Sequence, residues 1–405
     1  MRKRVVVTGL GIVSCLGNDL DVVSEALALG RSGIRAMPEW RELGLLSCVA
    51  GVPDLSGESP IDRKLHRFMG DSATYAYHAM GHALADAGLL PAEVSNPRTG
   101  LILGAGVGSL FHHARTMDTF HSKGMHRVPP YAVPRIMGNT ASAALATAFR
   151  IQGVSLTLSS ACASSAHAIG AAAEQILLGR QDMVLAGGAE EVCWTTSVGF
   201  DAMGALSTGH NDTPGTASRP YDVSRDGFVI SGGAGLLVLE EMSHAEARGA
   251  SIYAELVGYG ACSDGHDMVS PSMEGAARAM RLALDDAGLS TVDYVNTHAT
   301  STQAGDIAEV LALKEIFGRD MPPFSSTKGL SGHPIGASGV HEAIYSLLMM
   351  RDGFLAGTAN LETPDPALEG LPLLRETTRT GIRSFMTNSF GFGGTNACLV
   401  FRRPE

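Results

Sequence analysis

The sequence contains no pair of cysteines close enough to form a CxxC motif. Its six cysteines are scattered along 405 residues, at positions 15, 48, 162, 193, 262 and 398. Neither a disulfide framework nor a zinc site is therefore indicated, and a reducing cytoplasm fits this pattern. No apolar run approaches the roughly 20 residues that a membrane-inserted helix needs. Glycines interrupt the apolar N-terminal stretch, so we predict a buried strand there and not a signal peptide.

Basic residues are fewer than acidic ones, and the formal net charge is −11, which argues against general nucleic-acid binding. GAGVGS at residues 104–109 lacks the full G-x-G-x-x-G pattern, so no dinucleotide cofactor is predicted. The histidines of residues 112–126 lack metal-ligand spacing, and we predict no metal site and no cofactor. What the chain does have is 45% hydrophobic residues and 49 glycines, which predict a large core with many tight turns.

Strand-like and helix-like segments alternate along the chain, which predicts an α/β fold with sheets covered on both sides. ALADAGL at residues 83–89 recurs as ALDDAGL at residues 283–289, and a strand-like segment follows each copy. A second echo pairs HAIGAA, which starts at His167, with HPIGAS, which starts at His333. These echoes predict two similar halves joined near residues 241–251.

We place the first predicted half at residues 1–245 and the second at residues 246–405. The first half carries a candidate nucleophile, and the second carries candidate histidine and lysine residues. Residues 112–135 are interpreted as a loop-rich excursion from the first half.

A cysteine stands between a predicted strand and a predicted helix. Residues 154–158 are typical of a buried strand and residues 166–178 of a helix, and only small residues surround Cys162 between them. A position at a helix start favours a thiolate, so Cys162 is a candidate nucleophile. The alternative is a buried structural thiol in a small-residue packing site.

Three further segments place polar groups after predicted strands. His298 follows the strand 292–296, while Lys328 and His333 follow the strand 323–326. Because sites in α/β folds lie at the carboxyl ends of strands, these side chains are candidate catalytic groups. MTNSFGFGGTN at residues 386–396 presents backbone N–H groups in a glycine-rich turn that suits an oxyanion. Each of these segments taken alone is more often structural than catalytic, but together they indicate a site.

Four segments resemble the signatures of one enzyme family, the β-ketoacyl-acyl-carrier-protein synthases: SSACASSAHAIG, NTHATSTQAGD, TKGLSGHPIGASG and NSFGFGGTNA. The resemblance extends over essentially the whole chain and is closest to the synthase I type of elongating enzymes. It implies a thiolase-like fold of two duplicated halves in a five-layer α-β-α-β-α arrangement, in a homodimer. It also implies a decarboxylative condensation of acyl-carrier protein with malonyl-carrier protein in fatty-acid elongation, which releases CO2 and free carrier protein.

The same resemblance implies roles for five residues at the reacting atoms. Cys162 would carry the acyl group, and its N–H would form an oxyanion hole with that of Phe392. His298 and His333 would bind the malonyl thioester carbonyl. Lys328 would organise the site and orient the second histidine.

Further residues are implied around them. Glu309 would be the partner of Lys328. The substrate-contacting residues would be Thr300, Thr302, Phe228, Phe390 and Val107. Two positions depart from the family pattern: HATST replaces HGTST, and valine stands at 107. If that glycine is held at positive φ, Ala299 would cost about 1 kcal/mol.

The implied partner is acyl carrier protein, which is acidic like this chain. Docking would therefore need a local basic patch. DRKLHR and SKGMHR supply the candidates Arg63, Lys64, Arg67, Lys123 and Arg127. The alternative is an ordinary solvated helix start.

Other members of the same superfamily compete with this interpretation. A polyketide or specialised-lipid ketosynthase would have the same fold. A non-catalytic chain-length factor would lack the nucleophile, so Cys162 argues against it. A thiolase would carry a CGGG-type loop where FGFGG stands here.

Overall fold

The computed structural model of the chain describes residues 3–404. The strands are β1 (Val5–Val13), β2 (Ile34–Ala36), β3 (Val49–Gly51), β4 (Thr99–Gly104), β5 (Ser155–Leu158), β6 (Met183–Glu190), β7 (Gly233–Glu241), β8 (Ala254–Ser263), β9 (Val295–Asn296), β10 (Phe324–Ser325), β11 (Phe354–Leu355), β12 (Thr378–Arg379), β13 (Ser384–Gly391) and β14 (Thr395–Arg402).

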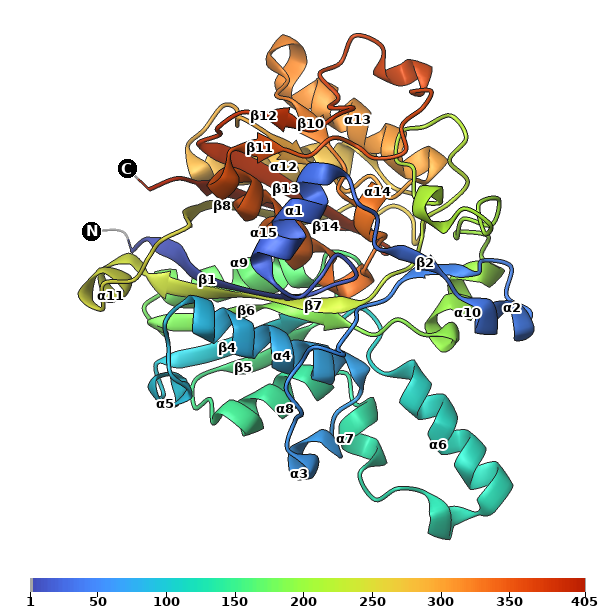
Figure 1. Cartoon of the computed structure of the whole chain (residues 1–405). Coiled ribbons are helices and arrows are strands. Elements are labelled where there is room, and N and C mark those ends of the chain that lie inside the picture. The colour runs from blue at the N-terminus through green and yellow to red at the C-terminus, as the bar shows by residue number, and fades with distance from the viewer. Residues whose placement is uncertain (1–2, 405) are drawn as a thin grey trace.

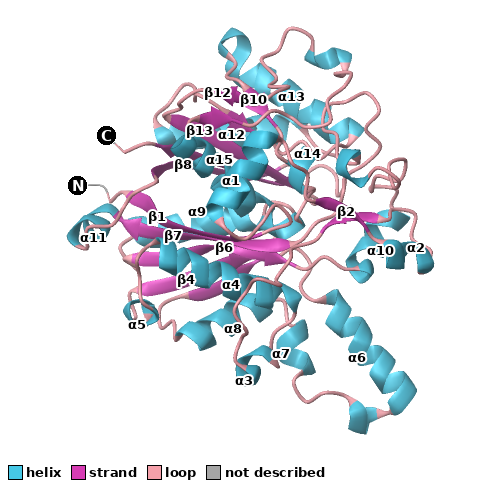
Figure 2. Cartoon of the chain, in the orientation of Figure 1, coloured by secondary structure: helices cyan, strands magenta, loops and turns pink. Residues whose placement is uncertain are grey.

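Helices fill most of the connections between these strands (Figure 2). The α-helices are α1 (Leu20–Leu29), α2 (Pro38–Glu42), α3 (Arg63–His66), α4 (Asp71–Asp86), α5 (Pro91–Val94), α6 (Leu110–Lys123), α7 (Ala132–Ile136), α8 (Thr140–Phe149), α9 (Ser164–Leu177), α10 (Trp194–Ala202), α11 (Met242–Ala247), α12 (Met273–Ala287), α13 (Gln303–Phe317), α14 (Lys328–Ser331) and α15 (Ser338–Asp352). The short 3-10 helices are η1 (Met125–Arg127), η2 (Pro214–Thr216), η3 (Gly318–Asp320), η4 (Ile335–Ala337) and η5 (Pro366–Leu368).

The main strands follow one order, β10-β9-β13-β14-β8-β1-β7-β6-β4-β5, which reads as two sheets joined where β1 meets β8. In the first sheet β1, β7 and β6 are antiparallel neighbours, and β6, β4 and β5 are parallel. In the second sheet β8, β14 and β13 are antiparallel, and β13, β9 and β10 are parallel. The pairing pattern therefore repeats strand by strand outward from the junction.

Helix contacts to the strands repeat as well. Gly11 of β1 lies against α4, where a Cβ would stand 1.9 Å from the carbonyl oxygen of Ala79. Gly260 of β8 lies against α12, where a Cβ would stand 2.1 Å from the carbonyl oxygen of Ala279. Both glycines permit a helix to approach the strand at backbone distance. The first sequence echo lies at the ends of these two helices and reflects this repeat.

The second sequence echo does not reflect the structural repeat. HAIGAA lies inside α9, while HPIGAS precedes α15. Each of these helices begins at a serine, Ser164 or Ser338, so the helix position of His167 corresponds to that of His341 and not to that of His333.

The helices form three layers around the two sheets (Figure 1). α4 and α8 cover the outer face of the first sheet, and α12 with α13 covers that of the second. α9 and α15 pack between the sheets, and every residue of α15 from Ser338 to Met350 is buried. A helix that is buried all round belongs to a central layer. The site loops leave the strand ends beside this layer.

Two expectations from the sequence differ from the structure. The loop-rich excursion predicted over residues 112–135 is mostly helical, because α6 and α7 lie there. The strand predicted to be buried is β5, which is the edge strand of the first sheet and exposes Leu156 by 44%. Within residues 3–404, none of the helices has the length and hydropathy that a membrane span requires.

Candidate active site

Cys162 lies in the turn that joins β5 to α9. The hydroxyl of Ser164 holds this turn closed: it accepts the N–H of Ser160 at 2.9 Å and donates to the carbonyl of Ala161 at 2.6 Å. Ala161 has φ +50°, in the left-handed region that residues with a Cβ rarely adopt. Strain of this kind persists where the surrounding structure holds it, and functional sites are common examples. The turn directs the cysteine into a cavity.

The thiol of Cys162 is neutral in the resting site. Burial raises its pKa to about 12, against the opposing effects of the Lys328 charge and the N–H of Phe392. The prediction of a helix-favoured thiolate is wrong, because α9 begins only at Ser164 and the loss of water dominates. The nucleophile therefore needs a neighbour that accepts its proton.

Two imidazoles face this thiol, and each follows a strand of the second sheet. His298 follows β9, and His333 follows β10 and α14. The Nε2 atom of His333 lies 3.0 Å from Sγ of Cys162. The three side chains offer atoms within 4.8 Å of one another, and the two rings meet edge to face at 5.2 Å. The structure thus brings the three predicted residues together.

Both imidazoles are neutral at neutral pH. Burial and then the positive charge of Lys328 hold the pKa of each well below its ordinary value, and His333 lowers that of His298 further. A neutral imidazole can accept a proton at one nitrogen or donate an N–H hydrogen bond. The pair can therefore act as a base for the thiol and as donors to an oxyanion.

Lys328 is buried at the centre of the site. Its Nζ forms an ion pair with Glu342 of α15 and lies 3.3 Å from Nδ1 of His298. Its carboxylate partner is therefore Glu342 and not the predicted Glu309. The histidine that it contacts is His298 and not the predicted His333. Because the ammonium group donates to Nδ1, the hydrogen of the His298 imidazole is left on Nε2.

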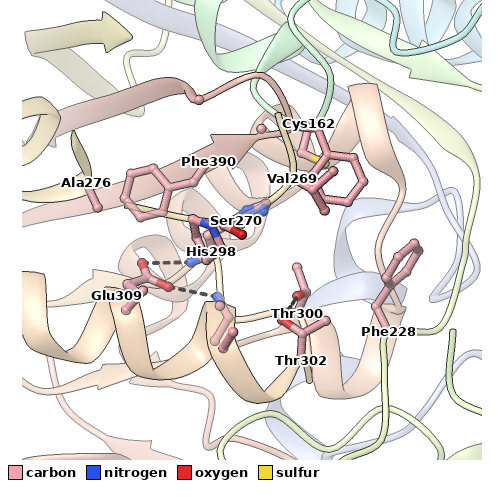
Figure 3. Close-up of a pocket in the computed structure, with 18 of the residues that line it drawn as sticks. Cys162, Phe228, Val269, Ser270, Ala276, His298, Thr300, Thr302, Glu309 and Phe390 are labelled. Atoms are coloured by element: carbon pink, nitrogen blue, oxygen red, sulfur yellow. Dashed lines mark hydrogen bonds between the residues drawn. The ribbon is translucent and has the colours of Figure 1, made fainter. Parts of the chain in front are cut away.

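Glu309 binds the main chain of the loop that carries His298. Its two carboxylate oxygens accept the N–H groups of His298 and Ala299, each at 2.9 Å (Figure 3). Asn388 donates to one of these oxygens at 2.9 Å. Burial raises the pKa of Glu309 to about 7, and these donors oppose the rise. Because its oxygens bind backbone N–H groups, Glu309 holds the loop in place, and the ion pair of Lys328 is formed with Glu342 instead.

A buried ion pair between Arg225 and Asp306 supports the same loop from the other side. Their closest atoms are 3.3 Å apart, and Asp306 also accepts the N–H of Ser301 at 3.1 Å. Ser301 has φ +74°, so this bond stabilises a left-handed residue. Sequence analysis missed Arg225, Asp306 and Glu342. The only signal in the sequence was an acidic residue within a helical segment, Asp306 near the start of α13 and Glu342 among the apolar residues of α15.

A cavity of about 300 Å³ opens onto the thiol and both imidazoles. Its aromatic walls contact the histidines: Phe228 lies 5.4 Å from the ring of His333, and Phe390 lies 5.9 Å from that of His298. Figure 3 shows the cysteine, the histidine and the threonines around this space. The predicted substrate-contacting residues that line it are Phe228, Thr300, Thr302 and Phe390, and Phe392 of the predicted oxyanion hole lines it as well.

Comparison with known proteins identifies this architecture. One family model, Beta-ketoacyl synthase, N-terminal domain, matches residues 2–245, and another, Beta-ketoacyl synthase, C-terminal domain, matches residues 253–362. The chain belongs to the β-ketoacyl synthase family. The 3-oxoacyl-[acyl-carrier-protein] synthase 1 of Haemophilus influenzae is 52% identical to this synthase over 403 residues, which cover 99% of each chain.

Solved structures of synthases have the same fold. A β-ketoacyl synthase from Burkholderia phymatum STM815 superimposes with a TM-score of 0.93 at 41% identity, over 100% of both chains. The ketosynthase AntDE, solved with the type II polyketide acyl-carrier protein AntF, gives a TM-score of 0.91 at 29% identity, again over 100% of both chains. The predicted family, the thiolase-like α/β fold and the class of condensing acyltransferase are confirmed.

The two departures from the family pattern have different outcomes in this synthase. Ala299 is buried and its N–H bonds to Glu309, while the left-handed residue of the loop is Ser301. The expected strain at Ala299 is therefore absent from this described loop. Val107 is 39% exposed and does not line the cavity, so the predicted wall position is not seen in the single chain.

The predicted carrier-docking residues lie away from the reacting atoms, on the surface of the synthase. α3 presents Arg63 and Lys64, and Arg67 caps its end. Lys123 ends α6 and Arg127 ends η1. All five side chains are exposed. Figure 1 shows α3 and the far end of α6 on the lower side of the molecule, with α7 between them.

Proposed function

We propose that this synthase condenses an acyl group held as a thioester on Cys162 with a malonyl unit carried by acyl carrier protein. The products are 3-oxoacyl carrier protein, CO2 and free carrier protein. One observation carries the proposal: Nε2 of His333 lies 3.0 Å from Sγ of Cys162, with His298 beside it, at the end of an aromatic cavity. The full-length similarity to a 3-oxoacyl-[acyl-carrier-protein] synthase 1 supports fatty-acid elongation as the setting.

In the first half-reaction, Sγ of Cys162 attacks the acyl thioester carbon and the sulfur of the carrier's arm leaves. The thiol proton passes to Nε2 of His333 and then to the leaving thiolate, so one thioester replaces another. The N–H groups of Cys162 and Phe392, which face the thiol, become donors to the oxyanion. Gly391 allows this approach, because a Cβ there would stand 3.1 Å from the nitrogen of Cys162.

In the second half-reaction, the malonyl thioester oxygen accepts hydrogen bonds from the Nε2–H of His298 and from that of His333, whose single hydrogen has by then moved from Nδ1 to Nε2. The bond to the carboxylate carbon breaks, CO2 leaves, and the electron pair forms an enolate stabilised by these donors. The enolate carbon attacks the acyl carbonyl, and the C–S bond to Cys162 breaks. The released thiolate takes up one proton from solvent. Lys328 keeps the imidazole of His298 in the donating tautomer.

The mouth of the cavity suits the arm of a carrier protein. Thr300 and Thr302 both line it, and their hydroxyl oxygens lie 3.1 Å apart. Two adjacent hydroxyls can bond the amides of a phosphopantetheine chain. Phe392 is 38% exposed beside the nucleophile, in a position to gate the acyl chain.

Carrier docking is assigned to the basic residues of α3 and to the end of α6. Arg135 of α7 extends the α3 group, since its Nε donates to the carbonyl of Arg67 at 2.9 Å. The patch is local, because the whole chain has a net charge of −11. The patch consists of the predicted residues Arg63, Lys64, Arg67, Lys123 and Arg127, with Arg135 beside Arg67.

The working unit is proposed to be a cytoplasmic homodimer. β5 is a sheet edge with the exposed Leu156, and none of the 14 residues of α6, all of them described, is buried in the single chain. An exposed edge strand and a helix with exposed apolar side chains favour pairing with a second copy of the chain. The six free cysteines are consistent with a reducing compartment. We propose that each copy consists of two halves, residues 1–245 and residues 246–405.

A polyketide ketosynthase is the second candidate, and the fold similarity to AntDE favours it. Mass spectrometry of products distinguishes the two. The purified synthase is supplied with malonyl-carrier protein and acyl-carrier proteins of several lengths. Fatty-acid elongation predicts a single 3-oxoacyl product, longer than the starting acyl chain by one two-carbon unit. Repeated extension to a poly-β-keto chain would support the polyketide alternative, and no extension at all would contradict both.

A further inference from the structure

Glu190 is a fully buried carboxylate, 0% exposed, that the proposed mechanism does not use. It is the last residue of β6. Its Oε2 accepts the N–H of Gly106 at 2.6 Å and that of Gly336 at 3.0 Å. Its Oε1 accepts the N–H of Val107 at 3.4 Å. One side chain therefore joins two segments that are far apart in the sequence.

Gly336 lies in η4, the turn that follows His333. In this turn Ile335 has φ +41°, a left-handed value for a β-branched residue, which other contacts must hold in place. On one side, the main chain of His333 is held by bonds from its N–H to Val229 at 2.8 Å and from Ser231 to its carbonyl at 3.0 Å. On the other side, Glu190 binds the turn.

The packing at this point leaves little room for adjustment. A Cβ on Gly336 would stand 2.3 Å from the nitrogen of Gly106, and a Cβ on Gly106 would stand 2.4 Å from Oε2 of Glu190. The loop after β4, the carboxylate and the turn after His333 are thus in direct contact. A shift of the carboxylate must move at least one of the two loops.

We propose that Glu190 is a positioning residue for the condensing reaction: by binding the amides of Gly106 and Gly336 with one oxygen, it sets where His333 meets Cys162. The inference rests on the proposed function, which assigns proton transfer and carbonyl binding to His333. The contact that it controls is the 3.0 Å approach of Nε2 to Sγ. Misplacement of a reacting group by about 1 Å costs on the order of 10²-fold in rate.

The length of the side chain and its carboxyl group can be varied separately by substitution. Glu190→Gln keeps the length of the side chain and an oxygen at the position that both glycine amides bind, and it replaces Oε1, which accepts the longer bond from Val107, with an NH2 group. Glu190→Asp keeps the charge but is one methylene shorter and cannot reach both loops. Glu191→Asp is the matched control, because Glu191 is the next carboxylate in the chain, equally buried, and binds Ser109 and Phe111 instead.

The test measures kcat and KM for malonyl-carrier protein with each purified variant. We expect Glu190→Asp to lower kcat on the order of 10²-fold with little change in KM, and Glu190→Gln to restore most of it. Glu191→Asp should stay close to wild type. If Glu190 were needed only for folding, its substitution would lower the melting temperature and the fraction of active enzyme. The turnover of each active site would then stay unchanged. Active-site titration counts the active molecules and so separates the two cases.

Crystal structures of the same variants test the inference without relying on activity. We expect the distance from Nε2 of His333 to Sγ of Cys162 to exceed hydrogen-bond length in Glu190→Asp and to be kept in Glu190→Gln. If Glu190→Asp does not fold, Gly336→Ala perturbs the same contact from the other side. Wild-type kcat in the folded variant, or an unmoved His333, overturns the inference. A wild-type enzyme that condenses nothing overturns the proposed function, while the distance measurement still decides the role of Glu190.

Discussion

Cys162 is half-buried at the end of an apolar cavity, yet its thiol must lose its proton to react. A dry cavity suits an acyl chain and a reactive enolate, but it raises the pKa of the Cys162 thiol to about 12. The structure reconciles the two by placing a neutral base, His333, in direct contact with the sulfur. The thiolate then forms only as the acyl thioester is attacked.

This account predicts the pH dependence of Cys162 alkylation. Only the thiolate reacts, and a raised pKa means that the thiolate fraction keeps increasing as the pH rises toward that value. The rate of modification by iodoacetamide, followed by mass spectrometry of the Cys162 peptide, should still be rising between pH 8 and 10. A plateau reached below pH 7 would show a stabilised thiolate and would contradict the assignment of His333 as proton acceptor.

Substitution of the histidines should separate the two half-reactions. His298→Ala removes a donor to the malonyl carbonyl but no group that touches the thiol, so acylation of Cys162 should persist while CO2 release falls about 10²- to 10³-fold. His333→Ala should lose CO2 release to a similar degree and acylate more slowly as well. Radiolabelled CO2 release and intact-mass measurement follow the two steps. Normal decarboxylation in either variant refutes the role given to that histidine.

The reacting residues were predictable because each follows a strand in a segment of small residues. Cys162, His298, Lys328 and His333 all carry this local signal. The charged residues that hold them in place carry no such signal. Glu342, for example, reaches Lys328 only because α15 packs between the two sheets. The family resemblance implied Glu309 as the partner of Lys328, and only the fold shows that the oxygens of Glu309 bind backbone amides.

Among the loops, the one that follows β9 depends on hydrogen bonds to its backbone. Glu309 and Asp306 of α13 bind the N–H groups of His298, Ala299 and Ser301. This arrangement explains how alanine replaces the usual glycine in HATST without strain. The position that needs a left-handed conformation is Ser301, two residues further along.

Ala299→Gly should therefore destabilise the protein, because the backbone at position 299 has no strain for a glycine to relieve. Glycine gives the unfolded chain more freedom, and the folded backbone at 299 gains nothing, so the free energy of unfolding should fall by about 0.4 to 1 kcal/mol. Chemical denaturation measures the change, with Gly265→Ala as a control at a true left-handed glycine, φ +63°, where the opposite substitution also destabilises. A more stable Ala299→Gly variant would contradict the described loop.

Elements with strong patterns were predicted to within a few residues, and those set by tertiary contacts were not. The alanine-rich helix predicted over residues 166–178 is α9, which spans Ser164–Leu177. α6 was missed because its sequence is rich in histidine and has no buried face in the single chain. β5 was predicted as buried because its residues are apolar, although it forms a sheet edge.

In the molecule as a whole, negative charge prevails, and the proposed carrier-protein partner is expected to be acidic as well. The exposed cations of α3 therefore have to act locally, and their contacts should be screened over a Debye length of roughly 10 Å at 0.1 M salt. The double substitution K64E and R67E should raise KM for acyl-carrier substrates severalfold, since exposed ion pairs contribute about 0.2 to 1 kcal/mol each.

The control for this docking prediction is a small acyl thioester that bypasses the carrier. Its KM should be nearly unchanged by the double substitution, and the wild-type preference for carrier-bound substrates should shrink with added salt. Equal effects on both substrates would mean that the patch is structural and that docking lies elsewhere.

The duplicated architecture explains why one site draws on both halves of the chain. The repeat of strand order places β5 and β10 in corresponding positions, so the loop with Cys162 and the loop with His333 leave equivalent strand ends. The first sequence echo predicted a repeat in the fold, whereas the second echo does not correspond to it. Neither echo could show which residues correspond, because the repeat is defined by packing contacts and not by sequence similarity.

The most direct test of the account is to follow the acyl group itself. Purified enzyme is incubated with acyl-carrier protein, digested and analysed by mass spectrometry, and then a matched sample receives malonyl-carrier protein. We expect one acyl mass on the peptide that contains Cys162, and its loss in step with equal amounts of CO2 and 3-oxoacyl-carrier protein. An acyl group on another cysteine, or full condensing activity in Cys162→Ala, would contradict the account.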